Sequence, residues 1–316
     1  MTRYVARRLL YLVPVWLGIS LLAFSLALLA PGDPVRSTLQ AQGIDAPSAE
    51  QVRELRRELG LDDPGPIRYA KWLAAAVQGD LGYSVRTGEP VLRSLADRFP
   101  RTAQLALIAI VLGLALALPL GILAALFRDR AMDHVSRLGA LVGASIPSFW
   151  LAYLLIILFA VQLRLLPVAG SNTPQHVILP ALTLAIGAAA SLTRLTRSAM
   201  LEELTQEYVR TARSKGLRER SVVVGHALRN ALIAIVTVTG IRLAGLLGGA
   251  VIVETIFAWP GIGKYVVDSI SGRDYPTIQG FVLFAGTLVL LINLAVDLMY
   301  VALDPRVRLG GRAGGD

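Results

Sequence analysis

Long stretches of apolar residues alternate along this chain with segments in which charged residues gather. The first stretch, Leu9 to Ala30, contains no charged residue. At about 1.5 Å per residue it would extend roughly 33 Å as a helix, which is enough to cross a bilayer. Five further apolar stretches lie at about 102–127, 138–163, 177–195, 231–257 and 278–303. The pattern predicts an all-α integral membrane protein with six transmembrane helices.

A long polar interval, from Pro31 to about Arg101, separates the first two apolar stretches. Within it, residues 48–60 and 69–77 carry apolar side chains at helical spacing, which predicts two short amphipathic helices. We expect this interval to form a small extracytoplasmic subdomain between the first and second transmembrane helices.

A second charged interval, 201–232, lies between the fourth and fifth apolar stretches. Apolar residues recur from Leu201 to Ala212 at spacings of three and four, as on one face of a helix. Gly216 follows Lys215, a combination typical of a helix end, and a second helix is expected to begin near Ser221. This knob of helix, turn and helix is a candidate docking element, and an ordinary solvated loop is the alternative.

Composition agrees with a membrane protein and narrows its chemistry. The 316 residues are 54% hydrophobic and 17% charged, with a mean hydropathy of +0.60. The formal charge of +9 would suit nucleic acid, but most basic residues flank apolar stretches, as they do in cytoplasmic membrane loops. The sequence has no cysteine, which excludes disulfides and metal–thiolate sites.

The basic residues also predict the orientation in the membrane. Short loops on the cytoplasmic side of membrane proteins carry an excess of lysine and arginine. One set of short segments holds Arg3, Arg7, Arg8, Arg128, Arg130, Arg137, Arg306, Arg308 and Arg312 together with the basic residues of the knob. The short segments of the opposite side hold only Arg164, Lys264 and Arg273. We therefore expect the knob and both termini to be cytoplasmic.

No catalytic motif is recognisable. The HExxH, GxSxG and phosphate-binding GxxxxGK[ST] patterns are absent, and the histidines His134, His176 and His226 are scattered. A membrane enzyme would need a convergent acid–base or metal set, which the sequence does not suggest. We expect no catalytic residue, metal site or cofactor, so that energy for any transport would come from a partner or an ion gradient.

Polar features inside the apolar stretches are candidates for a translocation path. Arg242, Glu254 and Asp297 are ionisable residues, which are costly in lipid and usually face a cavity or a partner. A structural ion pair between Arg242 and Asp297, or snorkelling of Glu254, is the alternative. In the third stretch, Ser145 and Pro147 mark a break, because proline removes a backbone hydrogen bond.

Several separated motifs, in order, resemble the permease subunits of ABC importers of the dipeptide/oligopeptide/nickel type. The resemblance covers nearly the whole chain, and it is the combination of motifs that is specific. They are the opening RYVARRLLYLVPVWLGISLLAFSLALLAPGDPV, the outer-loop LGLDDPGPIRYAKWLAAAVQGDLGYSVRTGEPV, ASIPSFWLA from Ala144, EYVRTARSKGL from Glu207, HALRNAL from His226, ETIFAWPGIGK from Glu254 and LDPRVR from Leu303.

The resemblance implies a type I ABC importer permease fold in which the knob is the EAA loop that seats in a groove of an ATPase subunit. The coupling residues it implies are Arg210, Thr211, Ala212, Arg213, Lys215, Gly216 and Leu217. Ala212 and Gly216 fit the general EAA pattern, whereas Arg210 and Thr211 stand where that pattern has Glu and Ala. Gly216 would permit a sharp turn, and Leu217 could fill a pocket of the partner.

The break at Trp259, Pro260 and Gly261 is expected to line the outer mouth of the path. Four parts are expected: an N-terminal segment and first helix at 1–30, the extracytoplasmic subdomain at 31–101, a permease core at 102–303 that includes the coupling loop 199–230, and a cytoplasmic tail at 304–316.

By the same resemblance, the chain would be half of the translocation path of an ATP-driven importer in the bacterial or archaeal cytoplasmic membrane. The implied partners are a second, homologous permease in a heterodimer, two ABC ATPase subunits and an extracytoplasmic solute-binding protein, and no nucleic acid. Di- or oligopeptides are the expected substrates, and nickel chelates, glutathione or another small solute remain alternatives. A stand-alone secondary transporter is the alternative of a different class, although it would typically show internal repeats and several buried carboxylates.

Overall fold

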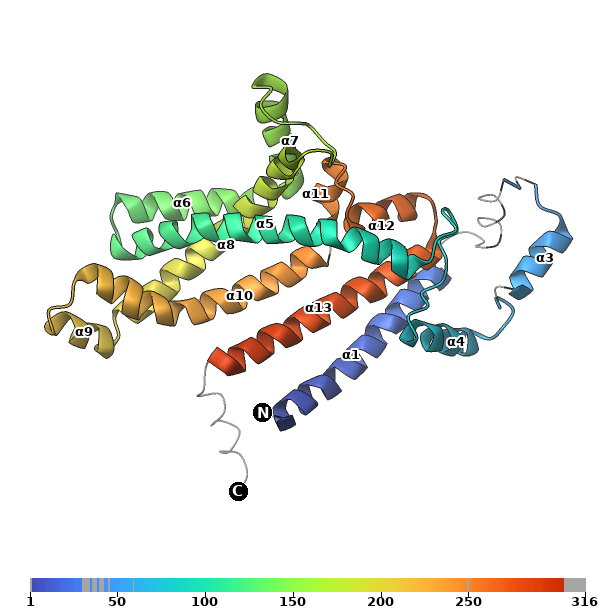
Figure 1. Ribbon diagram of the computed structural model, residues 1–316, viewed down its shortest axis with the longest axis horizontal. Helices are drawn as coiled ribbons and strands as arrows, with labels where there is room; N and C mark the ends of the chain where they lie inside the picture. The colour runs from blue at the N-terminus through green and yellow to red at the C-terminus, as the bar shows by residue number, and fades with distance from the viewer. Residues whose placement is uncertain are drawn as a thin grey trace. The chain divides into compact units, whose positions relative to one another are not determined.

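The computed structural model describes residues 2–29, 35, 39, 43–44, 46–58, 60–248 and 250–303. Over these residues the regular structure is helical, and the one β-bridge found there joins Tyr83 to Pro90 (Figure 1). The α-helices are α1 Thr2–Leu29, α3 Ala49–Glu58, α4 Gly65–Val77, α5 Val91–Leu126, α6 Ala131–Ser145, α7 Ser148–Leu155, α8 Ile178–Leu204, α9 Glu207–Ser214, α10 Arg229–Leu247, α11 Val251–Ile256, α12 Ile262–Ser271 and α13 Tyr275–Leu303. Shorter π- or 3₁₀-helical segments are η1 Ile156–Gln162, η2 Pro174–Val177 and η3 Ser221–Leu228.

The apolar stretches of the sequence become long helices, as expected. Among the described residues, five helices are long and apolar enough to cross a membrane, and a sixth crossing is reached if the bent pair of α6 with α7–η1 is counted as one span. The all-α membrane class is therefore confirmed. Residues 31–34, which end the opening motif, and the tail at 304–316 lie outside the described residues.

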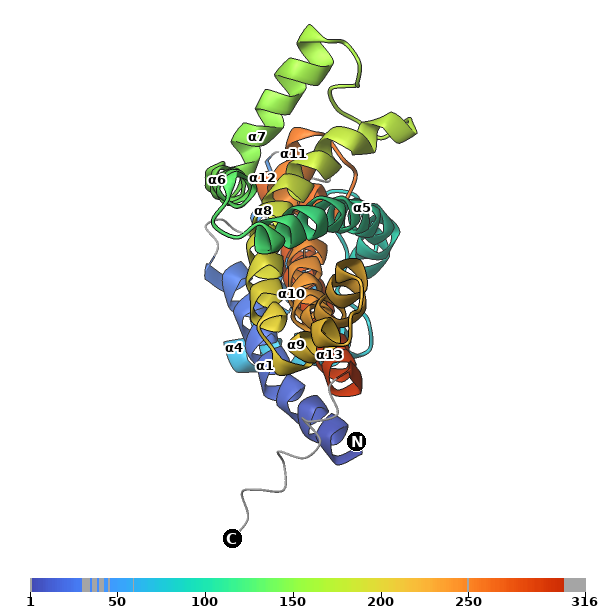
Figure 2. The same cartoon turned by 90° about the vertical axis from the view of Figure 1, so that its left-hand side faces the viewer.

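The third apolar stretch is more sharply broken than a proline kink would require. The axes of its two halves meet at 101° across Ile146 and Pro147 (Figure 2). The segment from Asp133 to Arg137, expected as a loop, forms the first turns of α6 instead. The buried Asp133 carboxylate accepts a hydrogen bond from the Asp129 N–H at 3.0 Å, which stabilises the start of this helix.

The fifth apolar stretch does not run to Phe257 as one helix. α10 ends at Leu247, Gly248 follows as its C-cap, and α11 starts only at Val251. Glycine is among the poorest helix formers, which explains a break at this position.

The helix of the second apolar stretch is longer than expected. α5 starts at Val91, ahead of the expected Thr102, because Val91 and Leu95 are buried in the core of the first of the chain's two compact units.

The described helices divide into two compact units. The first contains residues 1–102 and 260–290, and its core consists of Leu81, Val91, Leu95, Ile262, Tyr265 and Leu283. Its α1 is tied to α13 by a hydrogen bond of 2.9 Å from Trp16 Nε1 to Thr287 Oγ1. The predicted helices of the polar interval are confirmed as α3 and α4, and Ser48 and Gln51 form a capping box at the start of α3.

A buried carboxylate connects distant segments of this first unit. Asp274 accepts hydrogen bonds from the hydroxyls of Ser84 at 2.5 Å and Thr277 at 2.8 Å, and from the Val85 N–H at 3.1 Å. Three donors satisfy a carboxylate that is almost completely removed from solvent. The loop before α5 is thereby held to the start of α13.

The second unit, residues 103–259 and 291–316, is organised around α8. α5 and α6 both pack on α8 where small residues allow close approach. A Cβ at Gly121 would lie 2.5 Å from the Thr196 Cβ, and one at Gly143 would lie 3.3 Å from the Ala190 Cβ. α8 continues past the end of the expected fourth span and carries the charged knob at its end (Figure 1).

Candidate functional site

The first half of the charged knob, 201–216, contains the end of one helix and the whole of a second, and not the single helix that its periodicity predicts. α8 ends at Leu204, and Gln206 takes an extended conformation before α9 begins at Glu207. The expectation of one helical face from Leu201 to Ala212 is therefore wrong in detail. The second helix, expected near Ser221, begins at Glu219 and continues through η3 into α10.

A Schellman motif ends α9 at the glycine that the sequence singled out. Gly216 has φ of +73°, the left-handed region that glycine adopts without steric cost. The Leu217 N–H donates to the Ala212 carbonyl at 3.3 Å, and the Gly216 N–H donates to the Arg213 carbonyl at 3.0 Å. The direction of the chain after α9 is therefore fixed by backbone hydrogen bonds.

A small apolar core holds the knob to the ends of α8 and α10. Val209 and Ala212 of α9 are buried against Val222, Val223 and Ala227 of η3. Met200 of α8 and Ile235 of α10 belong to the same cluster. α9 therefore lies against η3, which leads into α10, and shares one apolar core with the end of α8 (Figure 1).

An ion pair closes the turn across its two arms. Arg213 donates to Glu219 from Nη2 at 2.7 Å and from Nε at 3.2 Å. These hydrogen bonds lower the pKa of Glu219 below its ordinary value and raise the pKa of Arg213. The planar fork of arginine suits such a bidentate contact, which restrains the turn although both side chains are partly exposed.

A second polar contact, which the sequence did not suggest, ties α9 to both neighbouring helices. The Tyr208 hydroxyl donates to Glu203 on α8 at 2.5 Å and accepts from Asn230 Nδ2 on α10 at 2.8 Å. Partial burial raises the pKa of Tyr208, and the hydrogen bond to Glu203 raises it further. Helical spacing alone marked Tyr208 as an apolar position, and its partners become evident only in three dimensions.

The expected coupling residues separate into an outer and an inner group. Arg210, Thr211, Lys215, Gly216 and Leu217 are exposed, as a partner-binding surface requires. Ala212 is buried in the core of the knob, so its role within the chain is packing. Arg213 is partly exposed, and its guanidinium is engaged by Glu219.

The expected path residues lie on several elements of the second unit. Ser145 and Pro147 stand at the break between α6 and α7, and both are exposed. Arg242 is exposed on α10 and Asp297 is half-buried on α13. Glu254 on α11 is completely buried, and no snorkelling position is compatible with that burial.

The expected gate residues are buried or half-buried at the junction before α12. Trp259 is buried in a cluster with Leu105 and Ala181 of the second unit. Pro260 and Gly261 begin the second segment of the first unit, where Gly261 precedes α12. Trp259 is therefore a packing residue within its unit.

Comparison with known proteins places the chain among transport proteins. The family model described as the binding-protein-dependent transport system inner membrane component matches residues 117–309, and the model of the N-terminal part of such membrane components matches residues 1–106.

Two curated relatives from Escherichia coli match over nearly their full length. The dipeptide transport system permease protein DppB is 38% identical over an alignment of 339 positions, which covers 98% of this chain and 99% of DppB. The glutathione transport system permease protein GsiC is 42% identical over 310 residues, with 98% and 99% covered.

The fold also resembles a solved structure. A crystal structure of the MetNI methionine ABC transporter in inward-facing conformations matches with a TM-score of 0.58 and 20% identity. The match covers 66% of this chain and 96% of the MetNI chain.

Proposed function

This chain belongs to the family of binding-protein-dependent transport system inner membrane components, and from that premise we propose that it is one half of the translocation path of a peptide importer. It is a membrane permease of an ABC importer and resides in the inner membrane. Di- and oligopeptides are the proposed substrates, because relatives named for dipeptide and glutathione transport align over nearly the whole chain.

The knob is the proposed contact with a cytoplasmic ATPase. The observation that carries this assignment is the fixed turn at Gly216, which presents Lys215 and Leu217 to solvent on a packed base. A docking element must transmit force without deforming, and both the core around Val209 and the ion pair of Arg213 with Glu219 resist deformation.

Movement of the knob would be passed to the membrane helices as rigid-body motion. The end of α8 and the start of α10 both lie in the core of the knob, so closure of the ATPases would rock these two helices together. In this arrangement the chain hydrolyses no ATP and needs no cofactor. The exposed Leu217 would enter an apolar pocket of the ATPase, while Arg210 and Lys215 face acidic groups at its rim.

The remaining parts follow from the same assembly. A second, homologous permease would complete the path, and two ATPases and an extracytoplasmic solute-binding protein would complete the importer. The polar interval 31–101 would face the binding protein, with the termini and the tail 304–316 in the cytoplasm. Ser145, Pro147, Arg242, Glu254 and Asp297 remain the proposed path residues.

The Trp259 to Gly261 junction is the proposed outer gate of that path. Its observed burial is compatible with a closed mouth, in which Trp259 packs against its own unit.

Two substitutions at one position test the coupling role. Gly216→Val should weaken the contact between the permease and the ATPase. A β-branched residue is strained at φ of +73°, at a cost of about 1–2 kcal/mol, so the turn should lose its geometry. Gly216→Asn is the matched control, since asparagine tolerates this region. A Cβ at Gly216 meets no atom of the chain within 4 Å, so neither variant clashes inside the knob.

The measurement is peptide uptake by the assembled importer in proteoliposomes, together with the amount of ATPase that co-purifies. Gly216→Val and Leu217→Asp should retain the permease in the membrane but lose ATPase and uptake, whereas Gly216→Asn should retain both. Normal coupling of Gly216→Val would contradict the proposal. Uptake by the permease without any ATPase would support the secondary transporter instead.

The orientation is tested separately by labelling. Because the chain has no cysteine, a single Gly216→Cys variant gives one reactive thiol without further engineering. A membrane-impermeant maleimide should label it in inside-out vesicles and not in intact cells. Labelling from outside would place the knob beyond the reach of a cytoplasmic ATPase.

A further inference from the structure

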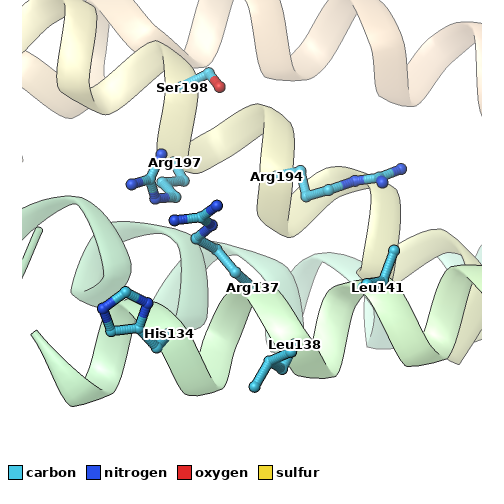
Figure 3. A pocket seen from close by; sticks show the side chains of 7 residues that line it. All are labelled: His134, Arg137, Leu138, Leu141, Arg194, Arg197 and Ser198. Carbon is cyan, nitrogen blue, oxygen red and sulfur yellow. The ribbon is translucent and has the colours of Figure 1, made fainter. Parts of the chain in front are cut away.

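A basic pocket lies between α6 and α8, a short distance along α8 from the knob. Its volume is about 460 Å³ (Figure 3). The residues that line it are His134, Arg137, Leu138, Leu141, Arg194, Arg197 and Ser198. Three arginines and a histidine thus share one cavity with two leucines.

A buried ion pair builds one wall of this pocket. Arg197 on α8 donates to the Asp133 carboxylate on α6 from Nε at 2.6 Å and from Nη2 at 2.7 Å. Asp133 is fully buried, and its hydrogen bond from the Asp129 N–H completes its environment. The pair fixes the start of α6 against α8 and neutralises the charge of Arg197.

Two arginines of the pocket form no ion pair of their own among the described residues, although Arg137 lies within electrostatic reach of the Asp133 carboxylate. Arg137 follows Asp133 by one helical turn, and Arg194 precedes Arg197 by three residues. Within the described part of the chain, neither Arg137 nor Arg194 takes part in a salt bridge or a side-chain hydrogen bond. The Arg137 side chain extends from α6 toward Arg197, whereas the Arg194 side chain points away from both of them (Figure 3). Guanidinium forks are well suited to bind the oxygens of a phosphate.

The apolar side of the pocket indicates what kind of phosphate fits. Leu138 and Leu141 are 61% and 55% exposed, and Val135 and Val142 on the same helix are exposed as well. α6 belongs to a segment apolar enough to lie in a membrane, where such side chains face hydrocarbon. A ligand with a charged head and apolar tails satisfies both the arginines and the leucines, whereas a free phosphate satisfies only the arginines.

We propose that this pocket binds the phosphate headgroup of an anionic phospholipid, with its acyl chains along Leu138 and Leu141. Basic pockets between membrane helices on the cytoplasmic side have the charge and depth to take such headgroups. The choice of leaflet rests on the proposed function: if the knob is cytoplasmic, Ser198, six residues before the end of α8, lies at the cytoplasmic leaflet. A bound lipid would bridge α6 and α8 next to the coupling element.

The test compares lipid retention by charge-matched variants of the full chain. Arg137→Gln/Arg194→Gln removes the two charges that lie outside the Asp133–Arg197 ion pair and leaves that pair in place. Arg128→Gln/Arg130→Gln is the control, because it removes the same charge from the neighbouring loop outside the pocket. Arg137→Lys/Arg194→Lys keeps the charge and shows whether the double glutamine variant fails for lack of folding.

The chains are purified from nanodiscs of phosphatidylglycerol in phosphatidylcholine, and bound lipid is counted by native mass spectrometry. Retained phosphatidylglycerol should fall about 30-fold in the glutamine pocket variant, the scale expected for two basic residues at an anionic leaflet. The loop control should retain it as the unmodified chain does, and the lysine variant should retain most of it.

Three results would overturn the proposal. Equal retention by the pocket variant and the loop control would show that the pocket does not hold the lipid. Displacement of the lipid by millimolar inorganic phosphate would identify a free phosphate site. In the assembled importer, cross-linking of a Leu138→Cys variant to another subunit would show that a protein covers the pocket.

The readout needs neither ATP nor transport, so it is independent of the coupling proposal. Loss of ATPase from Gly216→Val with normal lipid retention would leave the pocket assignment intact. If Arg137→Gln/Arg194→Gln loses its bound lipid while Gly216→Asn takes up peptide normally, the coupling assignment stands.

Discussion

Replacing Gly121 by alanine should force α5 and α8 apart. A Cβ at this position would lie 2.5 Å from the Thr196 Cβ, 2.8 Å from its Cγ2 and 2.9 Å from the Thr193 carbonyl oxygen. Two of these neighbours belong to the backbone or lie directly on it, so no rotamer change can move them away. The helices can accommodate the methyl group only by separating.

The magnitude follows from two opposing terms. Overpacking of this kind typically costs about 1–3 kcal/mol. Alanine also gains about 0.5–1 kcal/mol over glycine inside a helix, because it loses less backbone entropy on folding. Gly139→Ala on α6 is the control, because an added Cβ there meets nothing within 4 Å and only the gain in helix propensity applies. The difference between the two variants isolates the packing cost.

The assay is the thermal unfolding midpoint of the full chain, purified in one detergent for all variants. Gly139→Ala should unfold slightly higher than the unmodified chain and Gly121→Ala lower. For chains of this order of size, each kcal/mol of destabilisation lowers the unfolding midpoint by roughly 2–4 °C. A packing cost of about 1–3 kcal/mol should therefore separate the midpoints of the two variants by about 2–12 °C.

A second substitution tests whether Thr196 is the obstacle. Thr196→Gly removes the Cβ and Cγ2 that the new methyl group would strike, and the Thr196 hydroxyl has no hydrogen-bond partner among the described residues that would be lost. In a double-mutant cycle, Thr196→Gly should be less costly in the Gly121→Ala background than alone. Equal midpoints for Gly121→Ala and Gly139→Ala, or no coupling to Thr196, would refute the close contact of the two helices.

Other positions give shorter tests. Gly240→Ala should destabilise the chain by about 1–3 kcal/mol, because its Cβ would lie within contact distance of the Val296 side chain; Val296→Ala should restore the unfolding midpoint. Glu219→Gln should make the free energy of unfolding depend less on pH in the acid range. The hydrogen bonds from Arg213 lower the pKa of Glu219 in the folded state. The carboxylate therefore stabilises the fold above its unfolded-state pKa, and this contribution is lost as the pH falls through its folded-state pKa. That contribution should be below about 1 kcal/mol, as for other exposed pairs, and 1 M salt should reduce it. Asp274→Ala should cost about 1–3 kcal/mol in thermal unfolding, because it leaves the buried hydroxyls of Ser84 and Thr277 and the partly buried Val85 N–H without an acceptor. Asp274→Asn should cost less, because its amide oxygen still accepts.

Much of the fold could be predicted from the sequence because a bilayer imposes a simple rule. A transmembrane helix satisfies its backbone hydrogen bonds internally and presents about 20 apolar residues to lipid. The uncharged stretch from Leu9 to Ala30 meets both conditions, and this predicts a transmembrane helix there. The same holds for the glycine turn: Gly216 after a basic helix end is a local signal, and the Schellman motif at φ of +73° confirms it.

The breaks in the helices were less accessible. Pro147 predicts a disturbance, but the bend of 101° depends on what the two halves pack against. The end of α10 at Leu247 likewise depends on a competition between glycine propensity and packing, and apolar residues lie on both sides of the break. α5 extends to Val91 because residues of α12 and α13, far along the chain, cover its first turns.

The class of protein, the approximate position of its long helices and the turn of the charged knob could be read from the amino-acid sequence, since each of these rests on contacts with lipid or with near neighbours in the chain. Which charged and polar side chains meet follows instead from the way the helices pack. Asp133 and Arg197 are 64 residues apart, and Tyr208 finds Asn230 across 22. Hydrophobic periodicity shows which face of a helix is buried, but the partner of a buried polar group is set by the way whole helices pack, and no local pattern records it.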